Sequence, residues 1–263
     1  MKITKKIVVK VGTSTLTAHG KKLSRKHMLE LTRQIAYLHE QNYEVILVTS
    51  GAVAAGKDIL CHSTLESFPS KQMFSAVGQG QLMEIWNDLF SLFDIHVGQL
   101  LLTKEDFIKT ERQLNTHNTL NSLFKHKVIP IINENDSVAT EENRIGDNDN
   151  LAALVAITYE ADLLILLTDQ QGLYTKDPRF HPDATLISII NRIDESIFSL
   201  AKDSSTSLGT GGMRTKIEAA QKAREGGIQT VIAFGALHNV LIDITEGKQI
   251  GTTFQNFTSE NIL

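Results

Sequence analysis

The sequence predicts an α/β fold in which an open, mainly parallel central sheet is sandwiched between layers of helices. Three observations favour this class. Short apolar runs recur along the chain, segments with helical periodicity separate them, and polar or glycine residues follow where several of the runs end. Continuous apolar strands that alternate with amphipathic helices are typical of a parallel sheet covered on both faces.

Six buried strands are expected. Each is a short run of mostly apolar residues, bounded by polar residues or glycine, which favours a strand over a helix. They cover residues 7–11, 45–49, 96–102, 128–133, 163–169 and 230–233. Open α/β sheets bind ligands beyond the carboxyl ends of their strands. Residues that are far apart in the chain are therefore expected to meet at one edge of the sheet.

Helices are expected between these strands. Ser24 can cap a helix in which Met28, Leu31 and Ile35 share one face, at spacings of three and four residues. Further helices are expected over about 71–93, 110–126 and 151–159 and after the glycine-rich loop at 209–212. For the helix over 151–159, we expect either Asp149 or Asn150 to be the cap.

The composition indicates an ordinary globular chain. It has 263 residues, is 41% hydrophobic and carries a formal charge of −4, so it can bury a substantial core and shows no basic face for nucleic acid. Cys61 is the single cysteine, which excludes an internal disulfide and fits a reducing compartment. No signal peptide is apparent, and the apolar run 163–167 is too short to cross a bilayer. We expect a cytoplasmic protein that binds neither nucleic acid nor membrane.

The segment GTGGMRTK, from Gly209 to Lys216, is the most informative part of the chain. Glycines can turn several backbone N–H groups toward one point, the following helix adds its N-terminal dipole, and Lys216 adds a full charge. These features predict a phosphate-binding loop, although the Walker pattern is absent. The alternative is a surface loop that happens to precede a helix. We interpret residues 203–207, just before it, as a mobile lid over the nucleotide.

Two other strand ends carry candidate ligand-binding groups. Lys10 interrupts an apolar strand, and a buried lysine is costly unless an anion pairs with it. The alternative is that Lys10 extends to solvent at the strand end. Ser50-Gly51-Ala52 resembles a strand-to-helix turn whose N–H groups could hold a carboxylate or phosphate, and a plain turn with Ser50 as helix cap is equally compatible.

Acids and amides cluster at residues 133–136 and 146–150. The second cluster lacks the periodic ligands and the terminal glutamate of an EF-hand, so calcium is not favoured. A polar loop with a helix cap remains the alternative. The nine histidines show no metal-binding spacing.

Several long segments, taken together and in order, resemble the glutamate 5-kinase family of the amino acid kinase superfamily. They are VVKVGTSTLT (8–17), VTSGAVAAG (48–56), KQMFSAVGQGQL (71–82), HVGQLLLT (96–103), PIINENDSVAT (130–140), GDNDNLAALVA (146–156), LLTDQQGLYTKDPR (166–179) and GTGGMRTK. The resemblance implies one amino acid kinase domain over residues 1–263, with residues to about 160 binding mainly substrate and 161–263 mainly nucleotide. Many family members carry a C-terminal PUA domain. We expect none before Leu263, which leaves catalysis intact and puts PUA-dependent association or regulation in doubt.

The resemblance implies phosphorylation of the γ-carboxylate of L-glutamate by ATP, giving L-glutamyl 5-phosphate and ADP in the first step of proline biosynthesis. A carboxylate is already ionised at pH 7, so this chemistry needs no general base. Mg²⁺ is expected to accompany ATP, bridging phosphate oxygens with few protein ligands. A homodimer or homotetramer, feedback inhibition by proline and a downstream glutamyl phosphate reductase as partner are also implied.

The family's motifs assign roles to individual residues. Lys10 and Lys216 are expected to stabilise charge on the transferred phosphoryl group, and Asp149 to orient both lysines. Substrate binding is expected from Ser50, Asp136, Asn148, Gly51 and Ala52, with Thr13 and Asn133 as second-line candidates. ATP binding is expected from Lys10, Thr168, Asp169, Thr210, Gly211, Gly212, Met213, Arg214, Thr215 and Lys216.

Two alternatives remain. A kinase of the same superfamily could act on N-acetylglutamate or a nucleoside monophosphate, although the carboxylate of Asp136 favours a substrate with a free amino group. A non-catalytic sensor of nucleotide or amino acid is the second, and the presence of Lys10, Lys216 and Asp149 favours an enzyme.

Overall fold

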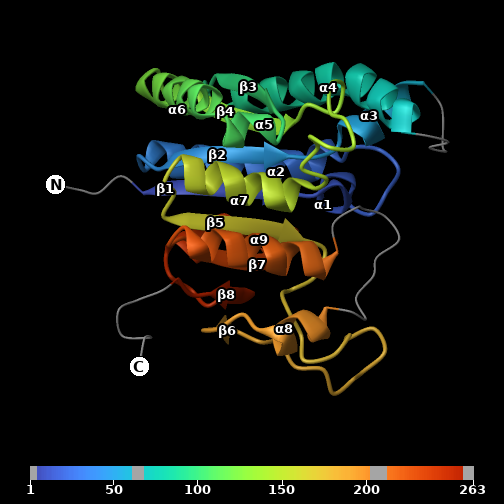
Figure 1. The fold of residues 1–263 in the computed structure, drawn as a ribbon, viewed down its shortest axis with the longest axis vertical. Coiled ribbons are helices and arrows are strands. Elements are labelled where there is room, and N and C mark those ends of the chain that lie inside the picture. Colours follow the sequence, from blue (N-terminus) through green and yellow to red (C-terminus); the bar gives the residue numbers. More distant parts are fainter. Residues whose placement is uncertain (1–4, 61–67, 202–211, 257–263) are drawn as a thin grey trace.

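The computed structural model describes residues 5–60, 68–201 and 212–256. Its centre is an eight-stranded sheet in the order β3-β4-β2-β1-β5-β7-β8-β6, which runs from top to bottom in Figure 1. The strands are β1 (Lys6–Val11), β2 (Glu44–Thr49), β3 (Val97–Leu102), β4 (Ile129–Glu134), β5 (Leu163–Thr168), β6 (Ile189–Ile190), β7 (Gln229–Phe234) and β8 (Thr252–Phe254). Among the paired strands described, only β7 with β8 is antiparallel. The predicted mainly parallel α/β fold is confirmed.

Helices cover both faces of this sheet. They are α1 (Thr13–Thr17), α2 (Arg25–Glu40), α3 (Ala52–Ile59), α4 (Phe68–Ser91), α5 (Glu105–Ile108), α6 (Thr110–Lys125), α7 (Asn148–Thr158), α8 (Glu195–Leu200), α9 (Met213–Glu225) and α10 (Val240–Thr245). One apolar core joins the sheet to α2, α4 and α10, and a second joins it to α6, α7 and α9. Side chains alternate between the faces of a strand, so Val9 and Val11 of β1 enter the first core and Val8 enters the second.

The caps of two helices test the sequence-based expectations. Ser24 caps α2 as expected, accepting the backbone N–H of His27. Helix α7 begins three residues earlier than expected, because Asp147 is its N-cap and accepts the N–H of Asn150 at 2.8 Å. The expectation that Asp149 or Asn150 caps this helix was therefore wrong. Asp149 lies instead in the first turn, where its carboxylate is free to point at other groups.

Helices α3 and α4 pack with their backbones in contact. A Cβ atom added to Gly78 would lie 1.9 Å from the carbonyl oxygen of Ala52, and one added to Gly56 would lie 1.9 Å from that of Phe74. Only glycine fits at such distances, so these two positions fix how closely the helices approach. The first residue of α3 follows Gly51, at the end of β2, and this contact therefore ties α4 to the carboxyl edge of the sheet.

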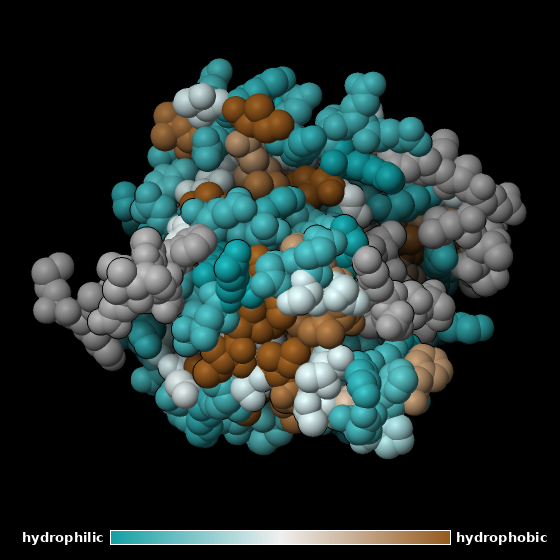
Figure 2. All heavy atoms as spheres, turned by 60° about the horizontal axis from the view of Figure 1, so that its bottom comes forward, coloured by the Kyte–Doolittle hydropathy of each residue, from teal (hydrophilic) through white to brown (hydrophobic). Residues whose placement is uncertain are grey.

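Within the described residues, no helix combines the length and apolar character needed to cross a bilayer. The side of β6 and β8, brought forward in Figure 2, is largely hydrophilic and has an apolar area near its middle.

Candidate active site

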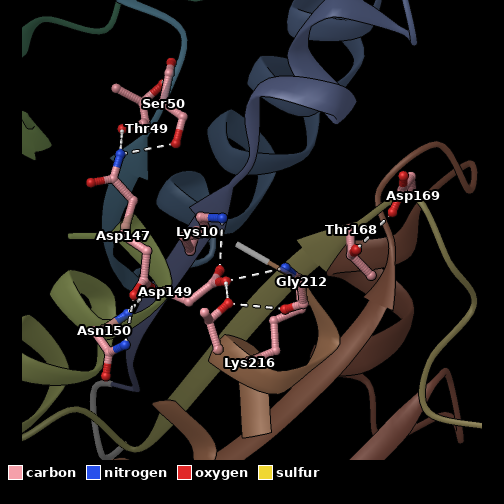
Figure 3. Close-up of polar contacts among 12 residues, drawn as sticks. Lys10, Thr49, Ser50, Asp147, Asp149, Asn150, Thr168, Asp169, Gly212 and Lys216 are labelled. Atoms are coloured by element: carbon pink, nitrogen blue, oxygen red, sulfur yellow. Dashed lines mark hydrogen bonds and ion pairs between the residues drawn. The ribbon is translucent and has the colours of Figure 1, made fainter. Parts of the chain in front are cut away.

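Two lysines converge on one carboxylate at the carboxyl edge of the sheet. Lys10 comes from β1, Asp149 from the first turn of α7 and Lys216 from the first turn of α9. Lys10 Nζ lies 2.7 Å from Oδ1 of Asp149, and Lys216 Nζ lies 3.1 Å from Oδ2 (Figure 3). The side chains of all three are at least nine-tenths buried. The structure thus brings together the three residues that the sequence predicted as catalytic.

Burial and charge act in opposite directions in this cluster. Burial alone would raise the pKa of the Asp149 carboxyl, but the ammonium groups of Lys10 and Lys216 outweigh it and hold that pKa well below its usual range. Burial lowers the pKa of the Lys10 ammonium; the neighbouring Lys216 adds to this shift, and Asp149 opposes it. The carboxylate is therefore firmly ionised and positions two cations that have little other solvation.

Two glycines keep side chains out of the space beside the ammonium groups. Gly12 follows the end of β1, and a Cβ atom there would lie 3.3 Å from Lys10 Nζ. Gly212 is the N-cap of α9, and among the described residues, its chain neighbours apart, a Cβ atom there would meet no atom within 4 Å. Thr215 links Asp149 to the start of α9, because its Oγ1 lies 2.8 Å from Oδ2 of Asp149 and 2.9 Å from the carbonyl oxygen of Gly212.

A second polar cluster lies beside the first, around Asn148. Its Nδ2 lies 2.8 Å from the carbonyl oxygen of Thr49, 2.9 Å from Ser50 Oγ and 2.9 Å from Asn133 Oδ1. The ends of β2 and β4 and the start of α7 therefore meet here. Ser50 does not cap α3; Gly51 does, with a positive φ of 107° that favours glycine.

Asp136 lies on the loop after β4 and faces helix α4. Its Oδ1 lies 3.0 Å from Lys71 Nζ, and its Oδ2 accepts a hydrogen bond from Ser75 Oγ at 2.8 Å. Farther along the same helix, Gln79 Oε1 accepts a hydrogen bond from Asn133 Nδ2 at 2.9 Å. The sequence patterns assigned no role to Lys71, Ser75 or Gln79. The signal that could have found them is their spacing of four residues, which places three polar side chains on one face of a helix.

Glu134 anchors the loop that leads into α7. Its Oε1 accepts the backbone N–H groups of Ile145 and Gly146, directly before Asp147. Burial raises the pKa of the Glu134 carboxyl, although the two N–H groups favour its charged form. These hydrogen bonds join the start of the loop that carries Asp136, at the end of β4, to its last residues before α7.

The predicted ATP-binding residues are only partly brought together. Thr168 ends β5, and its Oγ1 donates to Oδ1 of Asp169 at 3.1 Å (Figure 3). Met213 is buried in the apolar core, and Arg214 is exposed and paired with Glu218. Thr210 and Gly211, like the segment 203–207 interpreted as a lid, lie outside the described residues.

The remaining predicted substrate residues lie at the strand ends. Thr13 is the first residue of α1, directly after Gly12. Ala52 is the first residue of α3 and is buried. In the part of the chain that the structure describes, no three His, Cys, Asp or Glu side chains are grouped so that they could hold a metal ion.

The comparisons with known proteins agree with this geometry. Residues 5–233 match the model of the amino acid kinase family. Among solved structures, carbamate kinase from Giardia lamblia bound to AMP-PNP superposes with a TM-score of 0.68 at 20% identity, covering 98% of this chain and 100% of that one. UMP kinase from Ureaplasma parvum gives 0.63 at 16% identity, covering 96% and 99%. The chain belongs to the amino acid kinase family.

More similar relatives narrow the assignment. Glutamate 5-kinase from Pasteurella multocida (strain Pm70) is 52% identical over 255 residues, which cover 97% of this chain and 70% of that protein. Glutamate 5-kinase from Haemophilus influenzae (strain PittEE) is 51% identical over 259 residues, which cover 98% and 70%. Within the amino acid kinase family, the chain belongs to the glutamate 5-kinases.

Proposed function

We propose that this chain transfers the γ-phosphoryl group of ATP to the γ-carboxylate of L-glutamate, giving L-glutamyl 5-phosphate and ADP, the first step of proline biosynthesis. The observation that carries the proposal is the buried Lys10–Asp149–Lys216 cluster at the carboxyl edge of a glutamate 5-kinase fold. Two ammonium groups held by one carboxylate suit a reaction in which two anions must approach each other.

The reaction needs positioning and charge stabilisation rather than proton abstraction. A γ-carboxylate oxygen of glutamate attacks the γ-phosphorus, and the bond from that phosphorus to the β,γ-bridging oxygen breaks, leaving its electron pair on ADP. The acceptor is already ionised at pH 7, so no base is required. In our proposal Lys10 and Lys216 stabilise the charge on the transferred group and on the leaving oxygen. Asp149 holds both ammonium groups in place without being protonated.

The substrate side of the site is assigned to the ends of β2 and β4. Asp136 is proposed to bind the α-ammonium group of glutamate. Asn148, Ser50 and Asn133 already form one hydrogen-bonded cluster and are proposed to contact the substrate. The N–H groups of Gly51 and Ala52 are proposed donors to a carboxylate, and Thr13, at the start of α1, is proposed as a further contact.

The nucleotide side is assigned to the region after about residue 160. Thr168, Asp169 and residues 210–216 are proposed to bind ATP, and the positive end of the α9 dipole would favour phosphates bound at its N-terminus. Mg²⁺ is proposed to accompany ATP through phosphate oxygens and to neutralise part of their charge when bound. This fits the donor set, since both oxygens of Asp149 already face lysines.

Further properties of the family enter as proposals. We propose a single kinase domain in which residues to about 160 serve mainly the substrate, a homo-oligomeric assembly and a cytoplasmic location. Inhibition by proline and delivery of the acyl phosphate to a glutamyl phosphate reductase complete the proposal.

An ATP-consumption assay across glutamate, N-acetylglutamate, aspartate and UMP, with and without proline, tests the function. Glutamate should give ADP, and hydroxylamine should trap the acyl phosphate as a hydroxamate, whereas the other acceptors should give little turnover. Turnover with N-acetylglutamate or UMP but not glutamate would assign a different acceptor. ATP or glutamate binding without ADP release from any acceptor would identify a sensor.

A further inference from the structure

We propose that Lys71 binds the α-carboxylate of the substrate, so that the Lys71–Asp136 ion pair recognises the whole amino acid head group. This inference rests on the proposed function, in which Asp136 takes the α-ammonium group. The new element is a residue of α4 that selects a zwitterion rather than a simple cation.

The geometry orients both members of the pair. Lys71 Nζ lies 3.0 Å from Oδ1 of Asp136, and Ser75 Oγ donates to Oδ2 at 2.8 Å. Lys71 and Ser75 lie one helical turn apart, so both reach Asp136 from the same face of α4. A carboxylate offers about four acceptor positions on its two oxygens. Asp136 can therefore accept further hydrogen bonds from a ligand without losing these two partners.

The pair is open to a ligand, unlike the phosphoryl-transfer cluster. The side chains of Lys71 and Asp136 are 27% and 13% exposed, whereas those of Lys10 and Asp149 are 7% and 1% exposed. Helix α4 is also tied to the substrate side of the site at two other points. Gln72 Nε2 donates to the carbonyl oxygen of Ala139 on the Asp136 loop, at 2.9 Å, and Gln79 contacts Asn133.

Electrostatics decides which ligand fits this pair. A ligand ammonium group bound to Asp136 alone would lie close to the ammonium of Lys71, and like charges at such separations repel. A ligand that also carries a carboxylate next to its ammonium places that anion beside Lys71. The four charges then alternate, and every ion faces its opposite. Lys71 therefore favours α-amino acids and disfavours amines that lack the α-carboxylate.

Lys71→Met and Lys71→Arg test the proposal, with Lys5→Met as the matched control. Lys5 precedes β1 at the opposite edge of the sheet and lies over the Tyr43 ring. Steady-state constants for glutamate and ATP are measured, together with inhibition by the α-amide of glutamate, in which a neutral amide replaces the α-carboxylate. Thermal melting checks that each variant is folded.

Lys71→Met is expected to raise the KM for glutamate roughly 10-fold or more, the loss expected for one charged hydrogen bond. The KM for ATP should stay within about 2-fold, and Lys71→Arg should recover most of the loss. The inhibition constant of the α-amide should be unchanged or lower in Lys71→Met.

An unchanged KM for glutamate, or an equal loss for glutamate and its α-amide, would overturn the inference. Tighter glutamate binding by Lys71→Met would also overturn it, since Lys71 would then compete with the substrate ammonium. If the wild-type enzyme does not phosphorylate glutamate at all, the proposed function fails instead.

Discussion

The ammonium of Lys10 and the carboxylate of Asp149 lie 2.7 Å apart, in side chains that are 7% and 1% exposed. Removing Asp149 would leave the Lys10 ammonium buried without this counter-ion, which is far more costly than the loss of a surface ion pair. The other oxygen of Asp149 faces Lys216, so this single carboxylate connects the strand end at β1 with the start of α9.

Lys10→Ala and Lys216→Ala are each expected to lower kcat by about 10²-fold or more. In the proposed mechanism each ammonium stabilises charge that develops in the transition state, an effect worth roughly 3–4 kcal/mol. Initial rates at saturating glutamate and ATP measure the loss, and circular dichroism confirms the fold. Lys5→Ala is the control. Near-normal turnover by either folded variant would remove that lysine from the mechanism.

Asp136→Ala is expected chiefly to raise the KM for glutamate and to leave the KM for ATP nearly unchanged. The proposed ion pair with the substrate ammonium would form equally in the ground state and the transition state, so its loss should affect binding rather than turnover. Both constants are obtained from one two-substrate kinetic matrix. A weaker affinity for ATP with an unaltered KM for glutamate would move Asp136 to the nucleotide side.

As the pH rises, activity is expected to fall before the pH reaches the range in which ordinary lysines lose their proton. Burial lowers the pKa of Lys10, so this group loses its charge as the pH rises, while exposed lysines are still protonated. The pH profile of kcat/KM reports this titration in the free enzyme. Lys10→Arg keeps its charge over the whole range and should move the alkaline limb to higher pH. If the alkaline fall in kcat/KM occurs at the same pH in the wild-type enzyme and in Lys10→Arg, the group that titrates is not Lys10.

Gly78→Ala is expected to destabilise the fold strongly, and Gly80→Ala is its matched control on the same helix. A methyl group at Gly78 would lie 1.9 Å from the Ala52 carbonyl oxygen, whereas one at Gly80 would meet no described atom within 4 Å outside its own helix backbone. The first change should cost at least the roughly 1–3 kcal/mol of an overpacked core. The second should gain about 0.5–1 kcal/mol from helix propensity. Urea denaturation measures both, and equal stabilities would show that the helices can separate without cost.

Much of the fold could be predicted from the sequence, because its buried strands are continuous apolar runs. The six expected strands are all present within one or two residues of their expected ends. Strands β6 and β8 were not predicted. They contain two and three residues, too few to display any periodicity, and they are held by pairing with each other and with β7.

The site was predicted best where a residue conflicts with its surroundings. Lys10 stands in an apolar strand, and the conflict pointed to a buried anion, which is Asp149. The helix cap before α7 was misassigned, because several acids and amides follow one another and only the backbone conformation decides which one caps. Lys71 was not predicted, since a lysine in an amphipathic helix looks like an ordinary solvated side chain until the loop that it faces is known.

The backbone contact of α3 with α4 at Gly56 and Gly78 bears on the length of acid that the site accepts. In our proposal the substrate lies between the end of β2 and Lys71, and this close backbone contact would hold the two helices, and with them that span, at a fixed separation. A dicarboxylic amino acid one methylene shorter would then reach only one end of that span at a time. The choice between glutamate and aspartate would thus depend on two glycines that touch neither substrate.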